Sequence, residues 1–194
     1  MSPAGAGMVS GVVLAGGQGR RMGGVDKGLQ PLDGKPMIEH VLERLRPQVD
    51  EIVINANQNL ERYAAFGHAL APDVTGGFAG PLAGLQAGLQ AANHPLVVTA
   101  PCDSPFLPAD LVARLQAALG ANDLAVAKTG EQAHPVFALV HRSLAGHLSA
   151  FLAGGGRKID AWYASLRVVE VPFDDEADAF RNINTREELR AHER

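Results

Sequence analysis

The chain has 194 residues, 46% of them hydrophobic and 20% charged, which is enough for one well-buried core and too little for two comfortable domains. Its 17 basic and 21 acidic residues give a formal net charge of −4, which argues against a nucleic-acid or anionic-membrane surface and makes any positive potential local. The single cysteine, Cys102, excludes an internal disulfide, and with no signal-peptide core and no long apolar run we expect a cytoplasmic protein that does not span a membrane.

Predicted strands alternate with helical patterns along the chain. Short β-branched runs predict strands at residues 12–15, 51–55, 96–100, 124–128, 136–141 and 167–171. Several runs are apolar throughout, which indicates a mainly parallel sheet covered on both faces. Apolar stripes behind Pro36 and Pro108 predict two amphipathic helices, and the capping-box spacing of Thr185 and Glu188 predicts a last one. The expected fold class is α/β, a single three-layer Rossmann-like domain over residues 10–194 after a flexible tail at residues 1–9.

The first predicted strand opens onto a loop rich in glycine and cations, which reads L-A-G-G-Q-G-R-R-M-G-G-V-D-K-G from Leu14 to Gly28. Glycine lets the backbone approach an anion closely and present successive N–H groups, and Arg21 and Lys27 add full charges. A solvated loop with chance basic residues is the alternative, but such a loop after an early α/β strand is a recurring phosphate site. The dinucleotide fingerprint is excluded because Met22 stands where its third glycine belongs, and no Gly-Lys-Ser/Thr closes a P-loop.

Polar side chains follow two further predicted strands, and the carboxyl ends of parallel strands meet at one edge of a sheet. Asp103 lies just past the run at residues 96–100, and a single carboxylate there suits Mg²⁺, which takes other ligands from substrate phosphates and water. An aspartate that only caps its loop is the alternative. Asn55 and Asn57 stand at the end of the second strand and Asp73 stands in a later loop, where an amide or carboxylate oxygen could accept from guanine. Asp73 could equally be a turn residue.

The glycine-rich loop resembles the signature of nucleotidyltransferases, in the form found in the molybdenum cofactor guanylyltransferases. Further motifs of that family follow in the same order: N-A-N at 55–57, G-P-L-A-G at 80–84, P-C-D-S-P at 101–105, H-P at 134–135 and N-I-N-T at 182–185. Each motif is weak alone, but together they cover most of the chain and are highly specific. The doublet Gly16-Gly17 and the P-C-D-x-P loop favour guanine, because the related cytidylyltransferases usually show Ala-Ala-Gly and a different acidic loop.

The resemblance implies a Mg²⁺-dependent nucleotidyltransferase that joins GMP from GTP to the terminal phosphate of molybdenum-loaded molybdopterin and releases pyrophosphate. Asp103 would hold the metal, and Lys27 and Arg21 would supply cations to the phosphates. No general base is needed, because an acceptor phosphate is already ionised at neutral pH. The nucleotide-binding residues that the family pattern implies are Leu14, Ala15, Gly16, Gly17, Lys27, Asn55, Asp73 and Asp103.

Candidates for contact with the acceptor lie later in the chain. Arg157 and Lys158 belong to a second glycine-rich cationic turn, for which a solvated turn is an equal alternative. Asn182 and Asn184 alternate by two, so both side chains would face the same side of an extended segment, although they could instead only cap the last helix. His134 lies before a strand and is a weaker candidate, because a lone histidine is more often structural.

Three other functions stay open at this point: a cytidylyltransferase on the same acceptor, a sugar-phosphate nucleotidyltransferase, and a non-catalytic carrier of the cofactor. The expected partners are GTP and Mo-molybdopterin, with cofactor-insertion chaperones or molybdoenzyme apoproteins as further candidates, and neither nucleic acid nor membrane. Because the apolar stripes account for the visible hydrophobicity, a monomer is the default expectation.

Overall fold

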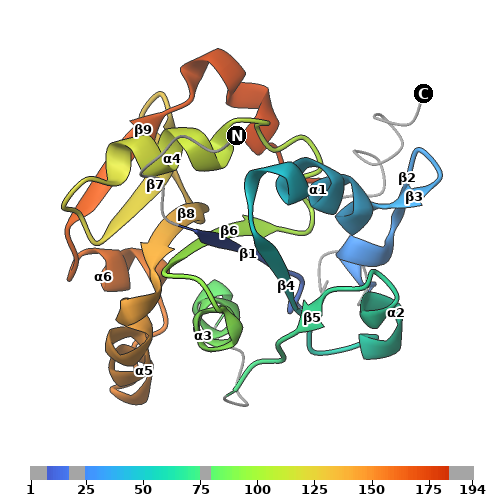
Figure 1. The fold of residues 1–194 in the computed structure, drawn as a ribbon, viewed down its shortest axis with the longest axis horizontal. Helices are drawn as coiled ribbons and strands as arrows, with labels where there is room; N and C mark the ends of the chain where they lie inside the picture. Colours follow the sequence, from blue (N-terminus) through green and yellow to red (C-terminus); the bar gives the residue numbers. More distant parts are fainter. Residues whose placement is uncertain (1–7, 18–24, 75–79, 184–194) are drawn as a thin grey trace.

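The computed structural model describes residues 8–17, 25–74 and 80–183. Seven strands within these ranges form one sheet in the order β5-β4-β1-β6-β8-β7-β9 (Figure 1). Their bounds are β1 Val9–Leu14, β4 Glu51–Asn55, β5 Ala69–Leu70, β6 Leu96–Pro101, β7 Leu124–Thr129, β8 Gln132–His141 and β9 Val168–Pro172. A separate hairpin pairs β2 (Pro31–Leu32) with β3 (Lys35–Pro36).

Strand directions confirm the expectation of a mainly parallel sheet. β1 is parallel to both β4 and β6, and parallel pairing also joins β4 to β5 and β7 to β9. β8 is the exception, because it runs antiparallel to β6 and to β7. All six predicted strands are present, although β1 begins earlier, at Val9, and β8 begins at Gln132.

Helices cover both faces of the sheet. In Figure 1, α1 and α4 lie on one side of the sheet, and α3 and α5 lie on the other. The helix bounds are α1 Met37–Leu45, α2 Leu60–Ala64, α3 Pro81–Ala91, α4 Leu111–Leu119, α5 Ala145–Ala153 and α6 Ile159–Tyr163. The sequence patterns predicted α1 and α4, but not α2, α3, α5 or α6. The predicted last helix, at Thr185, lies outside the described residues.

Each face of the sheet carries its own apolar core, and β1 contributes to both. Val9 and Val13 belong to the core under α1 and α4, whereas Val12 belongs to the core under α3 and α5. A Cβ on Gly11 would lie 2.9 Å from Leu45 of α1, so this glycine lets the helix approach the central strand closely. The single-domain α/β fold of three layers is thus confirmed within the described ranges.

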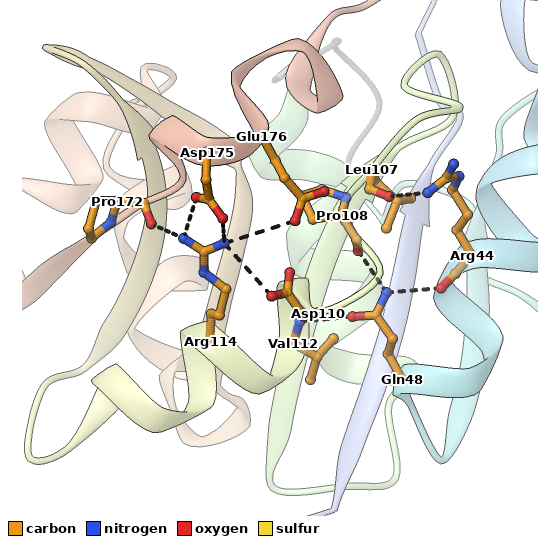
Figure 2. A network of polar contacts seen from close by, with 10 residues as sticks. All are labelled: Arg44, Gln48, Leu107, Pro108, Asp110, Val112, Arg114, Pro172, Asp175 and Glu176. Carbon is orange, nitrogen blue, oxygen red and sulfur yellow. Dashed lines mark hydrogen bonds and ion pairs between the residues drawn. The ribbon is translucent and has the colours of Figure 1, made fainter.

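Polar contacts tie the segment after β6 to helices on one face (Figure 2). Arg44 of α1 donates to the carbonyl of Leu107 at 3.2 Å. Gln48, in a short 3-10 turn after α1 (Arg46–Gln48), donates to the carbonyl of Pro108 at 2.9 Å and accepts from the N–H of Val112 at 3.0 Å. The loop that carries Asp103 is therefore fastened a few residues downstream.

In the part of the chain that the structure describes, every helix is too short or too polar to cross a membrane. Residue 9 already belongs to the sheet, and residues 1–7 of the predicted tail lie outside the described part. The proposed domain boundary stays a prediction.

Candidate functional site

Three parallel strands end side by side and bring their following loops together. The N–H of Ala15, after β1, donates to the carbonyl of Asn55 at the end of β4, at 2.8 Å. The N–H of Cys102, after β6, donates to the carbonyl of Leu14 at 3.1 Å. These contacts continue the parallel pairing of the strands by one step. The predicted meeting of distant segments at one edge of the sheet is therefore observed.

A cation and a carboxylate face one another at this edge. Nζ of Lys27 lies 3.1 Å from Oδ2 of Asp103, although the two residues are 76 positions apart in the sequence. The side chain of Lys27 is 21% exposed and that of Asp103 is 12% exposed. Because both charges are partly withdrawn from water, their attraction is screened less than that of a surface pair. Arg21, the other cation assigned to catalysis, lies outside the described residues.

Two amides hold the carboxylate of Asp73 from both sides. Nδ2 of Asn55 donates to Oδ1 of Asp73 at 2.8 Å, and Nδ2 of Asn57 donates to Oδ2 at 2.9 Å. The N–H of Asp73 donates back to Oδ1 of Asn57 at 2.8 Å. Asn55 is 2% exposed and also donates to the carbonyl of Ala71. The structure thus brings together Asn55, Asn57 and Asp73, the three residues that the sequence analysis considered for contact with guanine.

The glycine doublet lies against this amide cluster. Nδ2 of Asn57 donates to the carbonyl of Gly16 at 3.2 Å. A Cβ on Gly16 would lie 2.8 Å from the side-chain amides of both Asn55 and Asn57, so only glycine fits there without displacing them. A Cβ on Gly84, in α3, would also collide with Oδ1 of Asn55. Among the described residues, no atom lies within 4 Å of a Cβ placed on Gly17.

A buried network lies behind Lys27. Asp26 is 8% exposed, and its carboxylate accepts from the hydroxyl of Tyr63 at 2.5 Å and from Nδ2 of Asn59 at 2.9 Å. Burial raises the pKa of the Tyr63 phenol, with a smaller contribution from the nearby Asp26 carboxylate, so the hydroxyl stays protonated and donates. These two hydrogen bonds fix the carboxylate of Asp26, the residue directly before Lys27. Sequence reasoning did not find Tyr63.

Asn182 is the acceptor candidate that the structure brings to the Asp103 loop. Oγ of Ser104 donates to Oδ1 of Asn182 at 2.5 Å, and the N–H of Ile183 donates to the carbonyl of Asp103 at 2.9 Å. Asn184 lies outside the described residues. The side chain of Asn182 is exposed and is available to a ligand beside the Lys27–Asp103 pair.

Among the remaining acceptor candidates, the side chains of His134 and Arg157 have structural partners. His134 stacks on Phe180 with ring centroids 4.7 Å apart, its Nε2 lies 2.7 Å from Oγ1 of Thr129, and burial lowers its pKa. Arg157 donates to the carbonyls of Leu152 and Gly156, within its own turn. Lys158 is exposed at the start of α6. The structure does not join Arg157 or Lys158 to the Asp103 loop through any of these contacts, and their contact with the acceptor stays a prediction.

The donor set at the strand ends suits a magnesium ion that is shared with a substrate. Nowhere in residues 8–17, 25–74 and 80–183 do three His, Cys, Asp or Glu side chains gather into a metal-binding group. Mg²⁺ is commonly held by one or two carboxylates together with substrate phosphates and water, rather than by a protein cage. Asp103 is a partly buried carboxylate just after the carboxyl end of β6, and it fits that role.

Comparisons with known proteins agree with this geometry. The chain matches the model of the MobA-like NTP transferase domain over residues 11–168. It is 56% identical over 192 residues to the molybdenum cofactor guanylyltransferase of Cupriavidus taiwanensis, and 55% identical over 192 residues to that of Cupriavidus necator. Each alignment covers 95% of this chain and 96% of the relative.

A solved structure shares the fold over nearly the same length. The crystal structure of molybdopterin-guanine dinucleotide biosynthesis protein A from Archaeoglobus fulgidus superposes with a TM-score of 0.80 at 29% identity. The match covers 95% of this chain and 96% of that one. The similarity therefore extends over nearly the whole chain.

Proposed function

The chain belongs to the MobA-like NTP transferase family, together with the molybdenum cofactor guanylyltransferases, and we propose that it transfers GMP from GTP to the terminal phosphate of Mo-molybdopterin. An oxygen of the acceptor phosphate attacks the α-phosphorus of GTP, the bond between the α-phosphorus and the bridging oxygen to the β-phosphate breaks, and pyrophosphate leaves with that electron pair. The product is molybdopterin guanine dinucleotide.

The pairing of Lys27 with Asp103 is the observation that carries this proposal. It places an ammonium and a carboxylate 3.1 Å apart at the carboxyl edge of a parallel sheet, where ligands of such folds bind. Phosphoryl transfer requires that charge on the phosphate oxygens be neutralised and that the two reactants be aligned. Lys27 supplies a positive charge beside Asp103. Asp103 would hold Mg²⁺, which would neutralise negative charge on the phosphates of the substrate.

The cluster of Asn55, Asn57 and Asp73 is proposed to select the base. Both oxygens of Asp73 accept from amide groups, which fix the position of the carboxylate. A carboxylate can accept from the N1–H and amino group of guanine, whereas the ring nitrogens of adenine and cytosine at that edge are acceptors. The backbone around Leu14, Ala15, Gly16 and Gly17 is proposed to contact the nucleotide beside this cluster.

The acceptor is proposed to lie on the side of Asp103 where Asn182 meets Ser104. The hydrogen bond between these two side chains supports that side of the site. His134, Arg157, Lys158 and Asn184 stay candidates for acceptor contacts. Delivery to chaperones or apoenzymes, and the monomeric state, stay predictions as well.

Release of pyrophosphate from GTP, CTP, ATP and UTP tests the proposal when each is supplied with Mg²⁺ and Mo-molybdopterin, against matched mixtures without acceptor or with EDTA. We expect release with GTP alone among the four, and only when acceptor and metal are present. Preference for CTP would move the protein to the cytidylyl relatives. Release with a sugar phosphate in place of Mo-molybdopterin would change the acceptor, and no release under any condition would favour the carrier function.

A further inference from the structure

Tyr63 is a buried phenol in a helix whose other residues all face solvent. Within α2, from Leu60 to Ala64, Tyr63 alone is buried, with no exposed surface. Its ring belongs to the apolar core and packs against Phe66 with ring centroids 6.4 Å apart. A phenylalanine would fill the same space, so the hydroxyl has to be explained by what it binds.

The hydroxyl of Tyr63 binds the residue that precedes Lys27. It donates to Oδ1 of Asp26 at 2.5 Å, and Nδ2 of Asn59 donates to Oδ2 at 2.9 Å. Both donors are neutral: Tyr63 lies within α2, and Asn59 is its N-cap residue. A buried carboxylate is costly unless its oxygens are hydrogen-bonded, so these two donors fix where Asp26 can lie. The carbonyl of Asp26 in turn accepts from the N–H of Leu29 at 3.2 Å and closes the short turn that carries Lys27.

The same hydroxyl also lies where the Lys27 segment meets the Asp103 segment. A Cβ on Gly28 would be 2.7 Å from the oxygen of Tyr63 and 3.2 Å from Sγ of Cys102. The backbone at Gly28 therefore passes between the phenol and the residue directly before Asp103, with no room for a side chain. Tyr63 is thus in contact with one charged segment and within a few ångströms of the other, although it lies on neither.

We propose that Tyr63 is a positioning residue, which acts through Asp26 and Gly28 to hold Lys27 at its distance from Asp103. This inference rests on the proposed function, because it assigns Tyr63 a role in the geometry of that same site. Loss of the hydroxyl leaves the core filled but frees Asp26 from one of its two donors, so the turn that carries Lys27 is no longer fixed. A displacement of about 1 Å in a group that aligns a reaction can cost about 100-fold in rate.

The chain has two tyrosines, and the second provides a matched control. Tyr163 of α6 is also buried, and its hydroxyl donates to the carbonyl of Pro135 at 2.6 Å. Tyr63→Phe and Tyr163→Phe therefore remove the same atom from a buried hydrogen bond, one behind the Lys27–Asp103 pair and one elsewhere. The measurements are the thermal midpoint, kcat and KM for GTP with acceptor present, and the calorimetric Kd for GTP with Mg²⁺ and without acceptor.

We expect both variants to stay folded with similar losses of thermal midpoint. In Tyr63→Phe, kcat should fall by at least about tenfold and Kd for GTP should rise. The reason is that Lys27 and Asp103 would no longer be aligned with the phosphates of GTP. In Tyr163→Phe, Kd and KM for GTP should stay within about twofold of wild type, since a general loss of stability does not move them. A purely structural role for Tyr63 would instead lower the thermal midpoint alone.

Asp26→Ala provides the second variant, because Tyr63 keeps its place in the core. Asp26→Ala should lower kcat and raise Kd for GTP as Tyr63→Phe does. The double variant Tyr63→Phe/Asp26→Ala should have the same kcat and Kd as Asp26→Ala, because both substitutions break the same chain of contacts from Tyr63 through Asp26 to Lys27. Wild-type kcat and Kd in either folded single variant, or fully additive losses in the double variant, would overturn the role of Tyr63. Failure of the wild-type protein itself to release pyrophosphate would contradict the proposed function, which separates the two failures.

Discussion

Lys27 and Asp103 form a partly buried ion pair at the ends of the parallel strands. Their side chains are 21% and 12% exposed, so each charge is partly removed from water but still reaches the surface. A lysine in this setting gains a strong partner whenever a triphosphate approaches, because the phosphates carry several negative charges at close range. The interaction of Lys27 with Asp103 thus fixes the ammonium before substrate binds.

Removal of the ammonium should act on binding and on rate together. We expect Lys27→Ala to raise KM for GTP and to lower kcat/KM by about 100-fold, as loss of one charge-stabilising group typically does. Lys35→Ala is the control, because Lys35 is an exposed lysine whose ion pair is with Glu43 at 2.6 Å, at the surface beside α1. Steady-state kinetics of both variants check this, and a Lys27→Ala protein with wild-type KM and kcat would contradict the phosphate role of the loop.

Residues at the strand ends could be predicted from the sequence, whereas those behind them could not. Lys27, Asn55 and Asp103 stand in recognisable motifs, and the rule that parallel strands end at one edge brings their segments together. The role of Asp73 was implied only by the family resemblance, because its position in a loop is equally typical of a turn residue. Tyr63 stands in no such motif. Its partner Asp26 is 37 residues away, and the five-residue helix that carries it has no apolar periodicity to mark the buried position.

The N-terminus of helix α4 is capped by a residue from another part of the chain, which the local sequence does not reveal. Asp110 occupies the N-cap position but makes no capping hydrogen bond with its side chain, and it lies 3.8 Å from Arg114 instead. The N–H of Val112 is satisfied by Oε1 of Gln48, from the turn after α1 (Figure 2). Gln48, 64 positions before Val112 in the sequence, thus supplies the cap.

Loss of this cap should destabilise the protein without changing its chemistry. We expect Gln48→Ala to cost about 1 kcal/mol, because one helix N–H loses its acceptor and the carbonyl of Pro108 loses a donor. That corresponds to a fall of about 2–4 °C in thermal midpoint for a domain of this size. Asp110→Ala, which removes no capping bond, should have the smaller effect, and the reverse order in thermal denaturation would show that Asp110 is the working cap.

Strand and helix periodicity predicted some elements and missed others for physical reasons. α3 reads P-L-A-G-L-Q-A-G-L-Q-A and is buried along most of its length, so it lacks the polar face that marks an amphipathic helix. β8 has the β-branched and aromatic residues of any strand, and composition does not encode whether it runs parallel or antiparallel to its neighbours. Its direction follows from the short connection to β7, which only a hairpin turn can make.

Glu51, the first residue of β4, links three segments of the chain at the amino-terminal ends of the strands, opposite the site. Its carboxylate accepts from the hydroxyl of Ser10 in β1, and from the N–H and side-chain amide of Asn93 before β6. Burial by itself raises the pKa of Glu51, but the hydrogen bonds from Ser10 and Asn93 outweigh it, so the pKa lies below its ordinary value. The ionised carboxylate is therefore the form that the fold stabilises.

The sign of this shift predicts how stability changes with pH. Because the pKa of Glu51 is lowered on folding, its contribution is complete above the ordinary value and is lost as the pH falls through the lower, folded value. We expect Glu51→Gln to be less stable than wild type at about pH 7 and to approach it at about pH 3. Glu61→Gln, at an exposed position on α2, is the control for acid unfolding measured with urea. A constant gap between Glu51→Gln and wild type at both pH values would contradict the linkage.

The fate of each phosphate of GTP distinguishes guanylyl transfer from other reactions of a nucleoside triphosphate. GTP labelled with phosphorus-32 at the α position, and separately at the γ position, is incubated with Mo-molybdopterin, Mg²⁺ and either the wild-type protein or Asp103→Ala. We predict that wild-type protein moves the α label into the dinucleotide product and the γ label into pyrophosphate, and that Asp103→Ala moves neither. Transfer of the γ label to the acceptor, or no transfer of the α label by wild-type protein, would contradict guanylyl transfer at the strand-end site.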